Sequence, residues 1–570
     1  MTESTQSNKP WLKNYPKGVP ENIDISTHAS LVALFEDSFR RFAERKAYLY
    51  MGHALTFAQL DRQSRSFANY LQTLGLEPGA RVAIMLPNVL QFPIAMIGAI
   101  RAGCVVVNTN PLYTARELEH QLNDSGATVL IVLENFAHIF QSLQGKTQVK
   151  HVVVTSLGEH IGLKGKIVDF VVRHVKKLVP KWAIAGHASF TQALSIGRLQ
   201  PPRAVTMTHD SIAFLQYTGG TTGVSKGAVL LHRNILANLE QVDVWLSPAL
   251  TRHPIEQLVF LCALPLYHIF ALTSCAMVGL REGGMNILVP NPKDITGFIK
   301  LLGHHPEIHI FPGVNTLFNA LIHHPDFAKV KLPNLLVTIG GGMAVQKQVA
   351  DGWQALTGTP IVEGYGLSET SPVACVNTTI IEHYTGNIGL PVPSTEVRIL
   401  ADDGIEVALG SPGEIAIRGP QVMAGYWNKP QDTAAAMTSD GFFKTGDIGF
   451  MDQGGYVKII DRKKDMIVVS GFKVFPTELE EVIARLPGVL ECAVIGVPDE
   501  HTGEAVKLFV VKKDASLTIE QIQAYCKEQL TNYKRPKQIV FKTELPKSNV
   551  GKILRRELRD APSDSTTVNA

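Results

Sequence analysis

The chain has 570 residues, of which 45% are hydrophobic and 18% are charged. A chain of this composition can bury a large core, so disorder over its whole length is excluded. The 54 basic residues nearly balance the 51 acidic ones, which excludes the strongly basic surface expected of a nucleic-acid-binding protein. At roughly 150 residues per domain, the length predicts several domain-sized units in an ordinary enzyme-sized protein.

The N-terminus, residues 1–20, is polar and lacks the apolar stretch of a signal peptide. The six cysteines are scattered, and no two of them form a Cys-x-x-Cys pair. Neither a disulfide framework nor a structural zinc site is therefore expected, and the pattern is typical of a reducing compartment. We expect the protein to be cytoplasmic.

One stretch, residues 258–280, contains no charged side chain and is long enough to span a bilayer. It includes Pro265 and His268, and the phosphate-loop and acidic motifs described below lie on opposite sides of it. A single crossing would separate those motifs across the membrane. We therefore expect this stretch to be buried in the protein core.

Short runs rich in β-branched residues alternate with a helical pattern in the first part of the chain. A helix is predicted over residues 57–74, and Gly75 directly after it is a helix stop. Strands are predicted at residues 81–86, 105–108, 128–133 and 152–155. Strands that alternate with helices form parallel sheets covered by helices, so the predicted fold class is α/β.

Residues 461–465 are strongly charged, and a new pattern of elements begins after them. Thr477 and Glu480 have the spacing of a capping box, which predicts a helix there. Two apolar runs on either side of residues 498–503 predict a hairpin, which is followed by a helix from about residue 518. The sequence thus predicts a small α+β unit after a boundary at 461–466.

The most informative motif is the segment 217–227, which reads YTGGTTGVSKG and lies between two apolar strands. Its glycines let the backbone approach a phosphate, its hydroxyl groups can donate to phosphate oxygens, and Lys226 supplies positive charge. It is not a Walker A loop, because Ser225 stands where that motif has glycine. No G-x-G-x-x-G follows a strand, so a Rossmann dinucleotide site is unsupported.

This loop resembles the signature of the adenylate-forming enzymes, the family of acyl-CoA synthetases, luciferases and peptide-synthetase adenylation domains. Other motifs of the family follow in the expected order, and residues 440–464 are similar to the signature of its fatty acyl-CoA synthetases. The resemblance implies that Mg²⁺ and ATP activate a long-chain fatty acid to an acyl-adenylate, and that the acyl group then passes to CoA. The products would be acyl-CoA, AMP and pyrophosphate.

The resemblance also implies a domain organisation. A large N-terminal α/β domain of several packed sheets would be joined by a hinge to a small, mobile α+β C-terminal domain. The expected divisions are a loose N-terminal segment over 1–28, an AMP-binding domain with the acyl pocket over 29–461, a hinge over 462–466, a C-terminal domain over 467–560 and a tail over 561–570.

Site residues follow from the same resemblance. Tyr365 would stack on adenine, Asp447 would accept hydrogen bonds from the ribose, and Glu369 would bind Mg²⁺, a role that suits a hard carboxylate oxygen. Ser368 stands where the family has threonine. The full set expected to contact ATP or CoA is Tyr217, Thr218, Gly219, Gly220, Thr221, Thr222, Gly223, Lys226, Gly341, Gly342, Tyr365, Gly366, Ser368, Asp447, Arg462, Lys464, Gly471 and Lys473.

The catalytic residues implied by the resemblance are Lys552, Lys226, His268 and Glu369. Lys552 matches the lysine that enters the active site during adenylation, where its ammonium can stabilise charge on the α-phosphate. His268 ends a segment, residues 264–268, that matches the acyl-pocket motif. A neutral histidine buried in the core is the alternative for His268. An α-amino substrate is disfavoured, since this segment has no aspartate to hold an ammonium group.

Three alternatives to a long-chain ligase remain. One is a ligase for a medium-chain or aryl acid, and another is a fatty acyl-AMP ligase that uses no CoA. The third is a non-catalytic module that binds an adenylate or an acyl chain, which would not need Lys552. The sequence leaves open whether the protein forms an oligomer, and it gives no indication of a nucleic-acid partner.

Residues 163–182 combine regularly spaced apolar residues with six basic ones. A basic amphipathic helix of this kind can lie on an anionic membrane surface. The commoner arrangement is a surface helix whose apolar face packs into the core. Because a long-chain substrate partitions into membranes, peripheral contact with the inner face of the membrane is kept as an expectation beside the core-packed helix.

Overall fold

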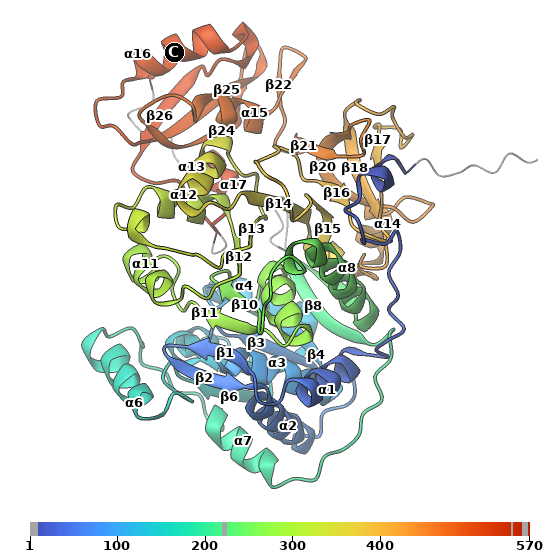
Figure 1. Cartoon of the computed structure of the whole chain (residues 1–570). Coiled ribbons are helices and arrows are strands. Elements are labelled where there is room, and N and C mark those ends of the chain that lie inside the picture. The colour runs from blue at the N-terminus through green and yellow to red at the C-terminus, as the bar shows by residue number, and fades with distance from the viewer. Residues whose placement is uncertain (1–8, 219–224, 549–550, 561–567, 570) are drawn as a thin grey trace, which may run out of the picture.

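The structure is a computed structural model that describes residues 9–218, 225–548, 551–560 and 568–569. Two large sheets form the body of the molecule, and smaller units lie above and beside them (Figure 1). The first large sheet has eight strands. Their spatial order is β19 (Gly425–Tyr426), β9 (Lys226–Leu231), β8 (Ile212–Thr218), β4 (Val105–Asn108), β3 (Arg81–Met85), β5 (Ala127–Leu133), β6 (His151–Thr155) and β7 (Ala188–Ser189).

The second large sheet has nine strands and is mainly parallel in its middle. Their order is β16 (Leu390–Pro391), β15 (Val373–Val376), β14 (Ile361–Gly366), β13 (Val337–Gly340), β12 (Ile310–Gly313), β10 (Val259–Cys262), β11 (Met285–Leu288), β1 (Lys46–Tyr50) and β2 (His53–Thr56). The mixture of parallel sheets and helices confirms the predicted α/β class.

Helices fill the space between and around these sheets. Every residue of α3 is buried, and α1, α2 and α3 pack on one another within the largest hydrophobic core. The helices of the body are α1 (Leu31–Arg41), α2 (Phe57–Thr73), α3 (Gln91–Arg101), α4 (Ala115–Ser125), α5 (Ala137–Gln141), α6 (Gly162–Phe170), α7 (Phe190–Arg198), α8 (His232–Leu250), α9 (Ile269–Ala271), α10 (Val278–Arg281), α11 (Ile295–His304), α12 (Asn315–Ile322), α13 (Lys347–Thr357) and α14 (Pro430–Ala436).

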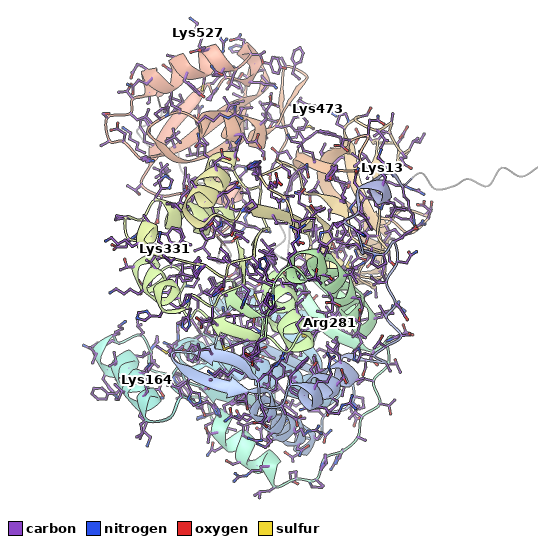
Figure 2. The ribbon with its side chains drawn as sticks, in the orientation of Figure 1. Lys13, Lys164, Arg281, Lys331, Lys473 and Lys527 are labelled. Atoms are coloured by element: carbon purple, nitrogen blue, oxygen red, sulfur yellow. The ribbon has the colours of Figure 1, made fainter. Side chains whose placement is uncertain are left out.

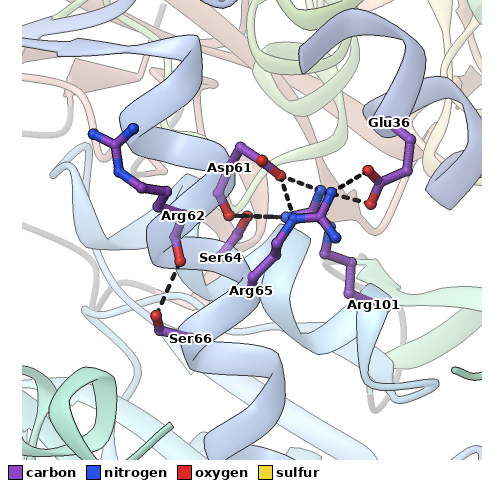
Figure 3. Close-up of polar contacts among 7 residues, drawn as sticks. All are labelled: Glu36, Asp61, Arg62, Ser64, Arg65, Ser66 and Arg101. Atoms are coloured by element: carbon purple, nitrogen blue, oxygen red, sulfur yellow. Dashed lines mark hydrogen bonds and ion pairs between the residues drawn. The ribbon is translucent and has the colours of Figure 1, made fainter. Parts of the chain in front are cut away.

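A buried arginine ties three of these helices together (Figure 3). Arg101, at the end of α3, lies 2.8 Å from Glu36 on α1 and 2.6 Å from Asp61 on α2. The same guanidinium donates to Ser64 Oγ at 2.6 Å, and Arg65 pairs with both carboxylates. A buried charge costs free energy unless it is paired and hydrogen-bonded, and this arginine has several such partners.

A four-stranded sheet lies beside the body, with the order β17 (Glu396–Leu400), β18 (Gly413–Arg418), β20 (Phe443–Met451) and β21 (Val457–Arg462). The described part of the N-terminal segment runs along it. Trp11 is buried there, and the hydroxyl of Tyr15 donates to Pro391 O at 2.6 Å. The expectation of a loose segment over 1–28 is therefore wrong for the residues from Lys9 onward, because two aromatic side chains anchor them.

The C-terminal unit follows a break between β21 and β22, and it lies at the top of Figure 1. Its sheet is built from β23 (Phe472–Val474), β22 (Ile467–Val469), β25 (Gly503–Lys512), β26 (Gln538–Lys542) and β27 (Val568–Asn569), with β24 (Val489–Asp499) paired to β25. Its helices are α15 (Pro476–Ile483), α16 (Ile519–Gln529) and α17 (Arg555–Asp560). The short β27 lies in the tail that was expected to be loose, and the rest of that tail is outside the described residues.

Most elements singled out in the sequence are confirmed. The helix before Gly75, the four early strands and the hairpin of β24 and β25 all form at the predicted places. The capping box at Thr477 is wrong, because α15 begins one residue earlier, at Pro476. The Thr477 backbone N–H donates instead to Asp461 Oδ2 at 2.7 Å, and Glu480 pairs with Arg555.

The uncharged stretch 258–280 is buried, as expected. It forms β10, α9, a π-helical segment and α10, and its apolar side chains belong to the largest core. Within the described ranges, no helix is long and apolar enough to cross a membrane. All six cysteines are buried and unpaired.

Candidate active site

The end of β14, the middle of β20 and the end of β21 bring an aromatic ring and two charges together. The Tyr365 hydroxyl donates to Asp447 Oδ2 at 2.6 Å, and Arg462 Nε lies 3.1 Å from Asp447 Oδ1. Asp447 and Arg462 are direct partners in the pairing of β20 with β21, so the strand register fixes this contact. The pKa of Arg462 is raised, chiefly by the Asp447 carboxylate.

A second group of side chains surrounds Glu369, which lies on the 3₁₀ turn Ser368–Thr370 after β14. The Tyr426 hydroxyl donates to Glu369 Oε1 at 2.8 Å. Lys226 Nζ lies 5.4 Å from the centre of the same Tyr426 ring, which is a cation–π distance, and pairs with Asp432 at 2.6 Å. Burial raises the pKa of Glu369. One tyrosine thus links the acidic residue to the lysine of the phosphate loop.

Lys552 reaches this site from the C-terminal unit. The preceding Gly551 has a φ of +78°, and its carbonyl accepts a hydrogen bond from Thr316 Oγ1 at 3.0 Å. Lys552 itself lies against the glycine turn after β13, since a Cβ on Gly342 would be 3.4 Å from Lys552 Cε. Burial, together with the charge of Arg462, lowers the pKa of Lys552 to about 8, while Asp447 and Glu369 oppose the shift.

His268 faces the same lysine. Its Nδ1 accepts a hydrogen bond from the Phe270 backbone N–H at 3.3 Å, which caps the short helix α9. Burial, together with the charge of Lys552, lowers the pKa of His268 to about 3. The imidazole is therefore neutral at physiological pH, and it stands at the join between the apolar stretch and the charged cluster.

The phosphate loop itself is only partly described. Gly219, Gly220, Thr221, Thr222 and Gly223 lie outside the described residues. At the two ends of the loop, Thr218 on β8 is paired in register with Lys226 on β9. The Tyr217 hydroxyl donates a hydrogen bond to the Asp124 carboxylate at 2.7 Å, so this hydroxyl already has a partner within the protein.

Some residues expected at the site are not brought to it. Gly471 and Lys473 lie on the exposed hairpin of β22 and β23, and Figure 2 shows Lys473 at the side of the C-terminal unit. Lys464 is nearer, and its Nζ is buried without a hydrogen-bond partner among the described residues. Burial, followed by the charge of Arg462, lowers the pKa of Lys464 to about 8. Of the remaining expected residues, Gly366 ends β14, and Gly341 and Ser368 lie on the turns after β13 and β14.

Two contacts were missed from the sequence. Tyr426 follows a glycine and precedes Trp427, and this Gly-Tyr-Trp triplet was the sequence feature that could have singled out Tyr426. Thr316 carries no signal, because a threonine at the start of a helix is ordinary. Only the fold places it against Gly551.

The carboxylates of the site decide which kind of metal centre it can form. No group of three or more His, Cys, Asp or Glu side chains in the described part of the chain is arranged to hold a metal. Mg²⁺ in phosphate-transfer sites is commonly held by one or two carboxylates together with substrate phosphates and water. A single buried carboxylate at Glu369 fits that kind of site, and it does not fit an all-protein cage.

Comparison with known families gives two matches. Residues 35–427 match the model described as AMP-binding enzyme, and residues 478–552 match the AMP-binding enzyme C-terminal domain. Together they cover the two large sheets and most of the C-terminal unit, including Lys552.

Curated relatives match over nearly the whole chain. The chain is 52% identical to a long-chain-fatty-acid–CoA ligase of Yersinia pestis, across 99% of this chain and 100% of that protein. Identity to the enzymes of the same name is 47% in Haemophilus influenzae, over 97% of this chain and 98% of the relative, and 37% in Bacillus subtilis, over 98% and 99%.

Solved structures share the fold. The anthranilate CoA ligase AuaEII, in complex with anthranoyl-AMP, matches with a TM-score of 0.82 at 25% identity, over 94% of this chain and 98% of that chain. ATP-bound MatB from Rhodopseudomonas palustris matches with a TM-score of 0.79 at 28% identity, over 93% and 98%.

Proposed function

The chain belongs to the AMP-binding enzyme family, and from that premise we propose that it is a long-chain fatty acid–CoA ligase. It activates a fatty acid with ATP and transfers the acyl group to CoA, supplying acyl-CoA to fatty acid degradation or lipid metabolism. The observation that carries the proposal is the full-length identity of 37 to 52% to curated ligases of that name. The convergence of Lys552 with Glu369, Asp447 and Arg462 on one site supplies the chemistry.

The nucleotide binds at the end of β14 and the middle of β20. Tyr365 offers its ring to adenine, beside the glycine turn at Gly341 and Gly342. Asp447 is held by Arg462 with its carboxylate turned to the ribose hydroxyls. Because both acceptor oxygens of Asp447 are already oriented by donors, binding needs little rearrangement of this side chain.

The first half-reaction forms the acyl-adenylate. A carboxylate oxygen of the fatty acid bonds to the α-phosphorus of ATP, and the bond to the pyrophosphate oxygen breaks. Negative charge develops on the α-phosphate oxygens, where Lys552 supplies an ammonium group, while Lys226 leaves Asp432 to hold the departing phosphates. Mg²⁺, when bound by Glu369 and the phosphates, neutralises part of this charge.

Neutral His268 lies beside Lys552, at the end of the apolar segment, and orients the carboxylate of the fatty acid. A protonated imidazole next to Lys552 would repel the ammonium group that the reaction needs. The low pKa of His268 prevents this throughout the physiological range.

The second half-reaction needs a different arrangement, in which the CoA thiolate attacks the acyl carbonyl and AMP leaves. We assign the pivot to Lys464, within a hinge over 462–466 that separates the domain over 29–461 from the one over 467–560. On one side Lys463 pairs with Asp402 at 2.9 Å, and on the other Asp465 pairs with Arg559 at 2.8 Å. Rotation between these two anchors withdraws Lys552 and brings Gly471 and Lys473 toward the path of CoA.

The proposed location is the cytoplasm, with peripheral contact at the cytoplasmic face of the membrane. CoA and ATP are water-soluble, whereas a long-chain fatty acid partitions into bilayers, so the two kinds of substrate meet at a membrane surface.

The test is release of AMP and pyrophosphate from Mg·ATP with hexanoate, decanoate, palmitate and benzoate, with and without CoA. CoA-dependent turnover that is highest with palmitate supports the proposal. Turnover highest with benzoate or hexanoate would replace it with an aryl or medium-chain ligase. Pyrophosphate release that CoA never accelerates would replace it with a fatty acyl-AMP ligase.

A further inference from the structure

Helix α6 and the turn after it expose an unusual amount of apolar surface. Five of the 13 exposed large apolar side chains in the described part of the chain lie within residues 163–178. Leu163, Ile167 and Phe170 are 80%, 66% and 59% exposed and follow one another at the i, i+4, i+7 spacing of a single helix face. Val175 and Leu178, in and just after the π-helical turn Val171–Val175, are 65% and 55% exposed.

The helix is attached to the body by its other face. A Cβ on Gly165 would lie 1.8 Å from Gly158 O, so only glycine permits this close backbone contact. The Asp169 carboxylate accepts hydrogen bonds from Ser156 Oγ and from the Gly158 backbone N–H, both at 2.7 Å. The inward face thus carries Gly165, Asp169 and two valines, Val168 and Val172, while Leu163, Ile167 and Phe170 face outward. The alternative of a core-packed helix is wrong for the regularly spaced apolar residues, because Ile167, Val175 and Leu178 are exposed.

Positive charge surrounds this apolar surface. Arg173 pairs with Glu134, and the Lys164 side chain donates to Met51 O. The side chains of four further lysines of the segment make no ion pair or hydrogen bond with the described residues. These are Lys166, Lys176, Lys177 and Lys181, and all four are exposed. Asp169 is the sole acidic residue over 162–182, and its carboxylate is turned inward. We call the five apolar residues and these four lysines the α6 patch.

We propose that the α6 patch docks the enzyme on the surface of an anionic phospholipid bilayer. Apolar side chains on one face would enter the boundary between head groups and acyl chains, and the lysines around them would contact lipid phosphates. The proposal rests on the proposed function, since a ligase for long-chain acids gains access to its substrate at that surface. Charge complementarity selects an anionic bilayer over a neutral protein surface as the partner.

The position of the patch suits this role. Figure 1 places α6 at one side of the body, well separated from the C-terminal unit, and Figure 2 places Lys164 on the same outlying helix. A bilayer bound there leaves the C-terminal unit free to rotate about the hinge. Docking and the two half-reactions can therefore proceed together.

The test is co-sedimentation of the full-length protein with vesicles of phosphatidylcholine alone or mixed with phosphatidylglycerol. We expect binding to the mixed vesicles that weakens as salt is added, because surface charges are screened. Ile167→Ser should weaken binding about tenfold, since it removes most of an inserted side chain. Ile405→Ser is the matched control, because Ile405 is 67% exposed on a distant hairpin, and it should bind like the unmodified protein.

A double variant, Lys176→Glu with Lys177→Glu, tests the charge. Each lysine near an anionic surface contributes roughly fivefold in affinity. Reversing the charge of two lysines should therefore reduce the affinity for anionic vesicles by at least about a hundredfold. Equal binding by the Ile167 and Ile405 variants would overturn the proposal, as would equal binding to neutral and anionic vesicles. A dimer in sedimentation that Ile167→Ser dissolves would assign the patch to a second copy of the chain instead.

Turnover of decanoate in solution, without vesicles, separates this inference from the proposed function. The α6 variants should turn over decanoate at the unmodified rate while binding vesicles poorly. If the unmodified protein turns over decanoate and binds no vesicles, the docking surface is wrong and the ligase assignment stands. If it binds vesicles through the α6 patch and turns over no acid, the ligase assignment is wrong and the docking surface stands.

Discussion

The hydroxyl of Tyr426 donates a hydrogen bond to Glu369, and the ring of the same tyrosine lies beneath Lys226. Glu369 and Tyr426 come from separate parts of the chain. Glu369 lies on the turn after β14, and Tyr426 lies on the short edge strand β19. Tyr426 thereby holds the proposed Mg²⁺ ligand and the phosphate-loop lysine at a fixed spacing. This relationship was not in the set of residues expected from the sequence.

The first prediction concerns that hydrogen bond. Tyr426→Phe keeps the ring under Lys226 but removes the donor to Glu369, and a hydrogen bond to a charged group contributes about 1.5 to 3 kcal/mol. We expect kcat/KM for ATP to fall about tenfold or more and the Mg²⁺ concentration needed for half-maximal rate to rise. Tyr525→Phe, whose hydroxyl donates to a carbonyl within the C-terminal unit, should change neither value.

The second prediction separates the two half-reactions. Lys552→Ala should slow pyrophosphate release by about a hundredfold to a thousandfold, the range seen when one charge-stabilising donor is lost. Transfer from synthetic palmitoyl-adenylate to CoA should stay within a few fold, because Lys552 is withdrawn in that step. Lys547→Ala is the control, since this lysine lies on the same segment as Lys552, pairs with Glu491 on β24 and has no assigned catalytic role. Equal slowing of both half-reactions would remove the role given to Lys552.

The third prediction is a pH dependence. The pKa of Lys552 is lowered to about 8, so the ammonium form that the adenylation step needs is present below that pH and is lost above it. The kcat/KM of adenylation should therefore fall as pH rises through about 8. In Lys552→Arg, whose guanidinium stays charged, the residual activity should show no such fall. A profile that is the same in both proteins would assign the titration to another group.

The fourth prediction tests how Lys552 is positioned. Gly551→Ala would place a Cβ 2.6 Å from Thr316 Oγ1 and at a positive φ, so the segment that carries Lys552 must shift. Adenylation should slow on the order of a hundredfold, as expected for a misplacement of about 1 Å. Gly404→Ala has a similar φ of +83° with nothing nearby, and it should cost only local strain. Similar rates for the two variants would show that the Thr316 contact does not position the lysine.

The fifth prediction concerns stability. Arg101→Met should lower the free energy of unfolding by about 2 kcal/mol, because it leaves the partly buried Glu36 and Asp61 with only the more exposed Arg65 as a shared partner. Arg40→Met removes an exposed pair with Asp37 and should cost less than about 0.5 kcal/mol. Urea denaturation of both variants measures the difference. An equal loss in the two would mean that burial adds nothing to the Arg101 network.

The fold class and four parallel strands of the first large sheet, β3 to β6, were predictable, because β-branched runs and helix stops are local signals. The capping box at Thr477 failed for a non-local reason, since Asp461 caps that backbone from the far side of the hinge. The alternative of a core-packed α6 failed for a similar reason. The contact of Gly165 with Gly158 decides which side of the helix faces the body, and it depends on where the two backbones meet. A hydrophobic pattern fixes which residues share a face but not which way the face turns.

The candidate site also contains some residues that the sequence identified and others that only the fold placed there. Glu369, Asp447, Arg462 and Lys552 stand in motifs that resemble a known family, so they could be singled out before the fold was seen. Tyr426 and Thr316 act by contact with those residues, and no motif in the sequence identified either. Gly471 and Lys473 were singled out too, but the present orientation of the C-terminal unit leaves them exposed.

The most direct test of the ligase assignment is a single-turnover experiment with enzyme in excess over radiolabelled palmitate. With Mg·ATP and no CoA, we expect palmitoyl-adenylate to accumulate on the protein together with pyrophosphate. Adding CoA should convert that adenylate to palmitoyl-CoA and AMP within one turnover. An adenylate that CoA leaves intact, or no adenylate from palmitate at all, would overturn the ligase assignment.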